Sequence, residues 1–135
     1  MIAVDSSAIF AILLREPEGA SFARILSEND CVVGAPTRLE TYMAVRARSA
    51  DAHVANLERI FGWKNIRTEA LTQEHYEAAS AAYDRYGKGR GHPAQLNFGD
   101  CLSYAVAKVG SLPLLYKGED FTRTDIDAAW TPEAP

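Results

Sequence analysis

The sequence has few cysteines and no long apolar run. Its only two cysteines, Cys31 and Cys101, do not form a Cys-x-x-Cys motif, so neither a disulfide framework nor a cysteine zinc site is expected. No apolar run approaches the roughly 20 residues that cross a bilayer, and the first residues show neither a basic region nor a cleavage motif. We therefore expect a cytoplasmic protein with free thiols and no membrane partner.

Several catalytic motifs are also missing. The sequence contains no glycine-rich phosphate loop of the Walker type and no Gly-x-Ser-x-Gly elbow, and neither cysteine has an evident histidine partner. The three histidines show no spacing typical of metal ligands. We expect His53 and His75 on the solvent side of helices and His92 in a loop.

The sequence has no excess of positive charge. It carries 14 Lys and Arg against 18 Asp and Glu, a formal net charge of −4, which disfavours a general nucleic-acid coat protein. An enzyme that cuts nucleic acid remains compatible with this charge, because clustered acids lower the net charge while basic residues line the approach. The candidates for such basic residues are Arg38, Arg46, Arg48, Lys88, Arg90 and Lys117.

Short apolar segments alternate with helical patterns along the 135 residues. Strands are expected at 2–5, 31–34, 65–70 and 113–116, with a last edge strand over 126–130. Helices are expected at 8–15, 18–29, 36–47, 51–62, 73–86 and 98–109. This alternation indicates a parallel sheet covered on both faces. We predict one α/β domain over residues 1–130, a three-layer α/β/α arrangement with a mostly parallel sheet of four or five strands, followed by a loose tail over 131–135.

Four acidic residues, Asp5, Glu40, Asp100 and Asp120, fall where this fold brings distant segments together. Asp5 ends the first strand, Asp120 follows the strand at 113–116, and the other two lie in the first turns of helices. Strand ends and helix starts share one rim of an α/β sheet. Clustered carboxylates stay ionised together only beside a positive charge, and Mg²⁺ takes oxygen ligands. The pattern predicts a metal-dependent enzyme of phosphoryl chemistry.

Each acid also has a structural explanation of its own. Asp5 and Asp100 can cap helices, Glu40 is favoured by the dipole of its helix, and Asp120 suits a turn. Glu40 lies beside Leu39, and we expect it to border a buried helix face that also includes Tyr42 and Met43. No one of these explanations accounts for all four acids on one rim.

Five segments together resemble the PIN-domain ribonucleases, most of all the VapC toxins of bacterial toxin–antitoxin pairs, over Ile2 to about Ala128. They are Val4-Asp5-Ser6-Ser7-Ala8, Leu39-Glu40, Tyr86-Gly87-Lys88-Gly89, Leu96-Asn97-Phe98-Gly99-Asp100-Cys101-Leu102-Ser103-Tyr104-Ala105 and Leu114-Leu115-Tyr116-Lys117-Gly118-Glu119-Asp120-Phe121 with Thr124-Asp125-Ile126. The resemblance gives the family's first three acids as Asp5, Glu40 and Asp100. Many relatives have the fourth acid, an aspartate, at the position where this chain has Gly118. In this chain Asp120 or Glu119 would have to take the place of that aspartate.

The resemblance implies an Mg²⁺- or Mn²⁺-dependent endoribonuclease in which Asp5 and Asp100 are metal ligands. A metal-activated water would attack an RNA phosphate in line with the leaving 3′ oxygen, and Glu40 would orient or deprotonate that water. The substrate would be single-stranded or loop RNA, contacted by the basic loop from Lys88 to Arg90. The implied partners are a cognate antitoxin and a second copy of the chain, giving a homodimer and a heterotetramer or larger assembly with the antitoxin.

Three other functions fit parts of the pattern. An aspartyl-phosphate phosphatase commonly has a second aspartate two residues after the nucleophile, where this chain has Ser7. A receiver-like phosphotransfer domain has an acid pair after its first strand and a phospho-acceptor on a middle strand, where this chain has Gly34. A catalytically silent binding module of the PIN fold is compatible with Gly118.

Overall fold

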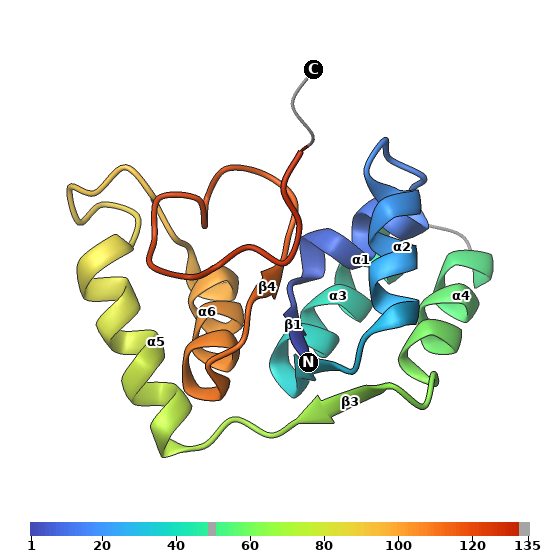
Figure 1. Ribbon diagram of the computed structural model, residues 1–135, viewed down its shortest axis with the longest axis horizontal. Helices are drawn as coiled ribbons and strands as arrows, with labels where there is room; N and C mark the ends of the chain where they lie inside the picture. The colour runs from blue at the N-terminus through green and yellow to red at the C-terminus, as the bar shows by residue number, and fades with distance from the viewer. Residues whose placement is uncertain (49–50, 133–135) are drawn as a thin grey trace.

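The computed structural model describes residues 1–48 and 51–132, arranged as a sheet with helices on both sides (Figure 1). Within these residues there are four strands and six helices. In chain order they are β1 (Ile2–Val4), α1 (Ser6–Leu13), α2 (Gly19–Glu28), β2 (Cys31–Gly34), α3 (Ala35–Arg48), α4 (Asp51–Phe61), β3 (Ile66–Glu69), α5 (Gln73–Tyr86), α6 (Phe98–Gly110) and β4 (Leu114–Leu115). Residues 133–135 of the predicted loose tail lie outside the described residues.

The sheet has the strand order β3-β2-β1-β4, and all of its pairs are parallel. The predicted parallel sheet of four or five strands is therefore confirmed. The prediction of an edge strand over 126–130 is wrong. Only a single bridge, between Ala128 and Leu114, joins this segment to the sheet. This segment follows β4 through two backbone hydrogen bonds of 2.9 Å, and β4 itself is too short to pair further.

Alternate residues of the strands point into two separate hydrophobic cores. Ile2 and Val4 of β1 pack into the core shared with α1, α2 and α4. Ala3, between them, packs with α5 and α6 on the other side, as the two-residue period of a strand requires. In Figure 1, α5 and α6 lie on one side of β1 and β4, and α1 to α4 on the other. The predicted three-layer α/β/α arrangement is confirmed.

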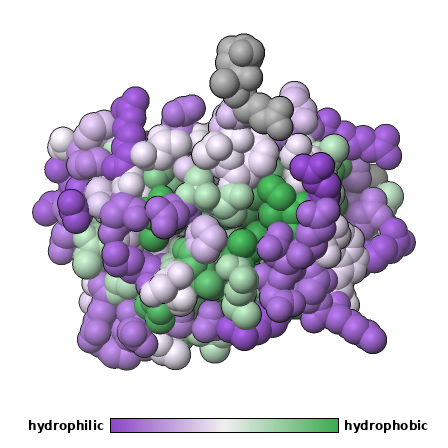
Figure 2. Space-filling model, viewed as in Figure 1, coloured by the Kyte–Doolittle hydropathy of each residue, from purple (hydrophilic) through white to green (hydrophobic). Residues whose placement is uncertain are grey.

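Hydrophilic and hydrophobic side chains are unevenly distributed over the broad face of the molecule shown in Figure 2. In Figure 2, hydrophilic side chains cover both ends of the molecule, and hydrophobic ones gather near the middle. Among the described residues, no helix is long and apolar enough to cross a membrane.

The buried side of α3 differs from the side that the sequence indicates. Thr37, Thr41 and Val45 are buried, whereas Leu39 and Met43 are largely exposed. The Thr41 hydroxyl donates to the backbone carbonyl of Thr37 at 2.7 Å, so this polar group is satisfied within the helix. Small threonines suit the close packing of α3 against its neighbours, and Leu39 and Met43 face outward.

The predicted solvent exposure of His75 is also wrong, because its ring is buried. Thr72 is the N-cap of α5, as expected, and its backbone N–H donates to His75 Nδ1 at 3.0 Å. The ring thus folds back onto the start of its own helix in a capping box. His53 is half-buried, and His92 lies in a loop, where its Nδ1 accepts from the Ala94 N–H.

Candidate active site at the carboxyl end of the sheet

Asp5 lies directly after the central strand β1 and is buried, with a fractional exposure of 4%. Its backbone N–H donates to Leu115 of β4 at 2.9 Å. Asp5 Oδ2 accepts from the Ser7 N–H at 3.1 Å and the Ser7 hydroxyl at 2.6 Å, while Oδ1 accepts from the Ser103 hydroxyl at 2.5 Å. Asp5 therefore caps α1 and is also held on both oxygens at the rim of the sheet.

Ser7 links Asp5 to the turn that follows β4. Its Oγ accepts a hydrogen bond of 3.0 Å from the backbone N–H of Lys117, which is 110 residues away in the chain. The Lys117 ammonium forms salt bridges with Glu16 and Glu18. These contacts hold the turn beside Asp5. Lys117 was one of the basic residues expected to line the approach of a nucleic acid, but its ammonium group is paired with Glu16 and Glu18.

Asp100 occupies the first turn of α6 in a reciprocal capping box. The Asn97 N–H donates to Asp100 Oδ2 at 3.0 Å, and the Asp100 N–H donates to Asn97 Oδ1 at 2.8 Å. Burial raises the pKa of Asp100 to about 6, with the charges of Asp5, Asp120 and Glu40 adding to the increase and the Asn97 hydrogen bond opposing it. The other three acids predicted from the sequence thus lie within electrostatic reach of Asp100.

Glu40 extends from α3 to the start of α6, where its carboxylate packs on Gly99. A Cβ atom at Gly99 would lie 3.0 Å from both Cδ and Oε1 of Glu40, and closer still to Oε2. The absence of a side chain at position 99 therefore leaves the space that this carboxylate fills. Partial burial of the carboxylate there raises the pKa of Glu40, the Asp5 charge raises it further, and a hydrogen bond with the Ser6 side chain lowers it.

The turn after β4 carries Gly118, Glu119 and Asp120. Gly118 has a φ of +103°, a conformation that L residues rarely adopt and that glycine allows at low cost. Beyond it, the exposed Asp120 contributes to the raised pKa of Asp100, whereas Glu119 contributes to the raised pKa of the Tyr116 phenol. Of the two acids that the sequence left open, Asp120 is the one whose charge adds to the raised pKa of Asp100.

The cluster carries negative charge that no salt bridge offsets. Within residues 1–48 and 51–132, none of the salt bridges includes Asp5, Glu40, Asp100 or Asp120. Across the same ranges, no three His, Cys, Asp or Glu side chains form a ready-made metal site. The available donors are all carboxylate oxygens, and the mutual repulsion at Asp100 favours a cation among them. Carboxylate oxygens are the type of ligand that Mg²⁺ and Mn²⁺ take.

Two residues of this site escaped the sequence analysis. Ser103, which donates to Asp5, lies three residues after Asp100, and this helical spacing was the available signal. Gly99 carries no signal of its own, because its role depends on Glu40 arriving from another helix.

The basic loop after α5 is anchored at its base. Gly87 and Leu96 form a parallel bridge, and the Lys88 N–H donates to Leu96 at 2.9 Å. Beyond this anchor, Lys88 and Arg90 are exposed, so both are accessible to an anionic partner.

Comparison with known proteins identifies relatives over nearly the whole chain. The PIN domain family model matches residues 2–127. Ribonuclease VapC30 of Mycobacterium tuberculosis (strain ATCC 25618 / H37Rv) is 39% identical over 124 residues, which cover 91% of this chain and 94% of the relative.

Two solved structures share the fold. The crystal structure of Mycobacterium tuberculosis VapC20, a sarcin-ricin loop cleaving toxin, matches with a TM-score of 0.70 and 19% identity, covering 90% of this chain and 93% of the other. A toxin–antitoxin complex from Klebsiella pneumoniae contains a chain that matches with a TM-score of 0.64 and 16% identity, covering 90% of each chain. At these identities the two structures support the arrangement of helices and strands.

Proposed function

The chain belongs to the PIN-domain family, as a VapC-type member, and on that premise we propose that it is a metal-dependent endoribonuclease and the toxin of a toxin–antitoxin pair. The observation that carries this proposal is the cluster of four acids formed by Asp100 with Asp5, Glu40 and Asp120, none of which forms a salt bridge among the described residues. Relatives named as ribonucleases and toxins support RNA as the substrate.

We assign Asp5 and Asp100 as the residues that hold Mg²⁺ or Mn²⁺. Both offer hard oxygen donors, and Ser7 and Ser103 fix the orientation of the Asp5 carboxylate. When bound, such a cation lowers the pKa of a water molecule and offsets the charge that develops on a phosphate. Asp120 adds a fourth negative charge to the same cluster.

Glu40 orients the attacking water and accepts its proton. Its raised pKa makes its carboxylate a stronger base than an ordinary glutamate. A bond forms between the water oxygen and phosphorus, the bond from phosphorus to the 3′ oxygen breaks on the opposite side, and the departing 3′ oxygen takes a proton from solvent water. Gly99 keeps the Glu40 carboxylate against the start of α6 for this task.

The RNA and the inhibitor use different features of the molecule. Exposed Lys88 and Arg90 suit contacts with the phosphates of single-stranded or loop RNA, whose bases are accessible. An antitoxin places an arginine among the acids, because an arginine–carboxylate pair satisfies the same charge imbalance as a metal. The match to a chain of a toxin–antitoxin complex supports such a partner.

The test is cleavage of a labelled RNA by purified protein, with Mg²⁺ supplied after treatment with a chelator. Asp5→Asn and Asp100→Asn should each lower the cleavage rate by at least about 100-fold, while circular dichroism shows an unchanged fold. Asp84→Asn is the matched control, because Asp84 is an exposed acid on α5. Equal cleavage by wild type and both site variants would place the activity elsewhere.

Membership in the PIN-domain family counts against a receiver or aspartyl-phosphate enzyme. Labelling of Asp5 by a small phosphodonor would reverse that judgement. Absence of cleavage by the wild-type protein, with normal metal binding, would favour the catalytically silent module.

A further inference from the structure

Hydrogen bonds from the protein fill most of the acceptor positions of the Asp5 carboxylate. An ionised carboxylate offers about four such positions on its two oxygens. The backbone N–H and the hydroxyl of Ser7 fill Oδ2, at 3.1 and 2.6 Å, and the Ser103 hydroxyl donates to Oδ1 at 2.5 Å. One acceptor position, on Oδ1, is therefore left for a cation.

The direction of the Ser7 hydroxyl group is fixed from its other side. The Ser7 oxygen accepts the backbone N–H of Lys117 at 3.0 Å, and a serine hydroxyl has a single hydrogen to donate. That hydrogen is directed to Asp5, because an ionised carboxylate only accepts. The turn after β4 thus holds Ser7 in the orientation that fills Oδ2 of Asp5.

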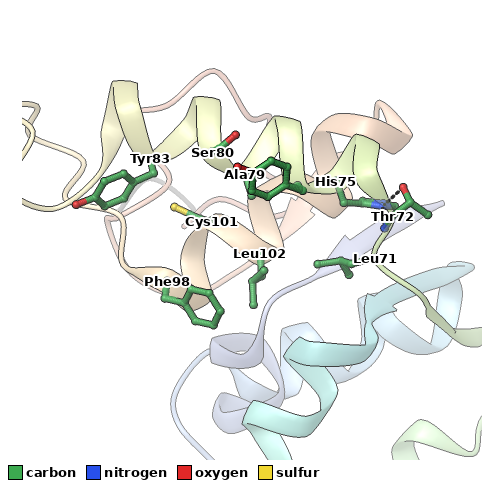
Figure 3. Close-up of a pocket in the computed structure, with 10 residues that line it drawn as sticks. Leu71, Thr72, His75, Ala79, Ser80, Tyr83, Phe98, Cys101 and Leu102 are labelled. Atoms are coloured by element: carbon green, nitrogen blue, oxygen red, sulfur yellow. Dashed lines mark hydrogen bonds between the residues drawn. The ribbon is translucent and has the colours of Figure 1, made fainter.

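The second hydroxyl donor comes from the helix that carries Asp100. Ser103 lies three residues after Asp100, so the two side chains share one face of α6. Ser103 is buried, with a fractional exposure of 2%, and a buried hydroxyl without a partner would be costly. Side chains on the opposite face of α6 line a hollow of about 520 Å³ beside α5 (Figure 3); they are Phe98, Cys101 and Leu102. The face of α6 that carries Asp100 therefore also supplies the clamp on Asp5.

The number of free positions matters because divalent cations use carboxylates differently. Ca²⁺ takes roughly six to eight oxygen ligands and often binds both oxygens of one carboxylate. Mg²⁺ requires near-ideal octahedral geometry and usually keeps several waters. With Oδ2 filled by Ser7, Asp5 can offer a cation one oxygen only.

We propose that Ser7 and Ser103 make Asp5 a one-oxygen ligand, which selects Mg²⁺ or Mn²⁺ against Ca²⁺. The inference rests on the proposed function, since it requires a cation held by Asp5. Ser7 determines the selectivity, because its hydroxyl closes Oδ2 to the cation. Ser103 determines the affinity, because it fixes the orientation of Oδ1. Both are positioning residues that act through Asp5.

The test is metal binding by the full chain after treatment with a chelator. Free Mn²⁺ is measured by electron paramagnetic resonance, with Mg²⁺ and Ca²⁺ as competitors. Ser7→Ala should lower the ratio of the Ca²⁺ to the Mg²⁺ dissociation constant by about 10-fold, because Oδ2 gains a free position. Ser103→Ala should raise both constants by about 10- to 100-fold and leave their ratio unchanged, because Oδ2 stays filled.

Two variants control for indirect effects. Ser7→Thr keeps the hydroxyl and should keep the wild-type ratio. Ser27→Ala removes an exposed hydroxyl that donates to Arg24 within α2, and it should change neither constant. The N-cap of α1 should persist in both Ser7 variants, because the hydrogen bond from the backbone N–H of residue 7 to Asp5 needs no side chain. Circular dichroism checks the fold.

Three results would overturn this inference alone. They are an unchanged ratio in Ser7→Ala, an equal shift in Ser7→Thr, and a wild type that binds Ca²⁺ as tightly as Mg²⁺, which needs no variant. A wild type that binds no Mn²⁺ would overturn both the inference and the metal dependence of the proposed function. Because the readout is binding, the expected selectivity in a protein that cleaves no RNA would support the inference and count against the nuclease.

Discussion

Replacing Gly99 with alanine should separate activity from stability. A Cβ atom at this position would lie 3.0 Å from Cδ and Oε1 of Glu40, whereas ordinary contacts between carbon and its neighbours are about 3.5–4.0 Å. The Glu40 side chain is flexible and would give way by about 0.5–1 Å. The backbone would stay in place, because the atoms nearest the new methyl group belong to that side chain.

The displacement sets the expected magnitude. A misplacement of about 1 Å in a catalytic group can lower a rate by about 100-fold, so Gly99→Ala should lower kcat/KM for RNA by 10- to 100-fold, or about 1.4 to 2.7 kcal/mol in the activation barrier. Alanine is favoured over glycine in helices by about 0.5–1 kcal/mol. The melting temperature of the variant should therefore equal or exceed that of the wild type.

A double-mutant cycle tests the mechanism directly. Glu40→Ala removes the carboxylate with which the new methyl group collides, so adding Gly99→Ala to that variant should change cleavage by less than about twofold. Gly62→Ala is the control glycine, since its Cβ would meet Glu58 and Arg59 oxygens at 3.3 and 3.5 Å, at the end of α4. Full activity of Gly99→Ala, or an equal loss with and without Glu40, would refute the reasoning.

Two further predictions concern stability and pH. The pKa of Asp100 is about 6 in the folded protein against an ordinary 3.8. The protonated Asp100 side chain therefore contributes stability that is fully present below pH 3.8 and lost as the pH rises through about 6. Asp100→Asn should therefore melt at a higher temperature than the wild type at pH 7 without divalent ions, and calorimetry at pH 4 should show little difference; a lower melting temperature at pH 7 would contradict this. The pKa of Asp125 is lowered, because hydrogen bonds from Lys108 and Tyr104 outweigh the effect of its burial. The contribution of Asp125 to folding stability is therefore present above pH 3.8 and lost as the pH falls through the lower pKa of the folded state. Asp125→Asn should lower the melting temperature at pH 7, and the difference from the wild type should shrink as the pH falls well below 3.8. An unchanged melting temperature at pH 7 would show that this network is not stabilising.

The sheet and the clustering of the acids could be predicted from the sequence because both follow from short-range patterns. Apolar segments such as 2–4 and 31–34 are buried on both faces, and this composition is typical of central parallel strands. Once the strands are parallel, their ends share one rim, and Asp5 and Asp120 must approach each other. The prediction of a first-turn position is right for Asp100 in α6 and wrong for Glu40, because α3 begins at Ala35 and Glu40 lies in its second turn. Glu40 still reaches the start of α6 through its long side chain.

The remaining features depend on contacts that local patterns do not contain. The periodicity of α3 identified an apolar side, but the helix buries Thr37 and Thr41 because of the neighbours against which it packs. His75 is buried because its ring caps its own helix. The segment 126–130 has the composition of a strand, yet the two-residue strand β4 offers it only one bridge. Gly99 acquires its role only from a side chain 59 positions earlier.

The link between Lys117 and Ser7 sets the order in which the site can form during translation. Asp5 and Ser7 are among the first residues to be synthesised, but the hydrogen bonds to them from Ser103 and Lys117 span 98 and 110 positions. The ribosome therefore holds a nascent chain whose first strand lacks one neighbour until most of the polypeptide has emerged. Under the proposed function, this delay means that the ribosome making the chain meets a complete acid cluster only once the chain is almost finished.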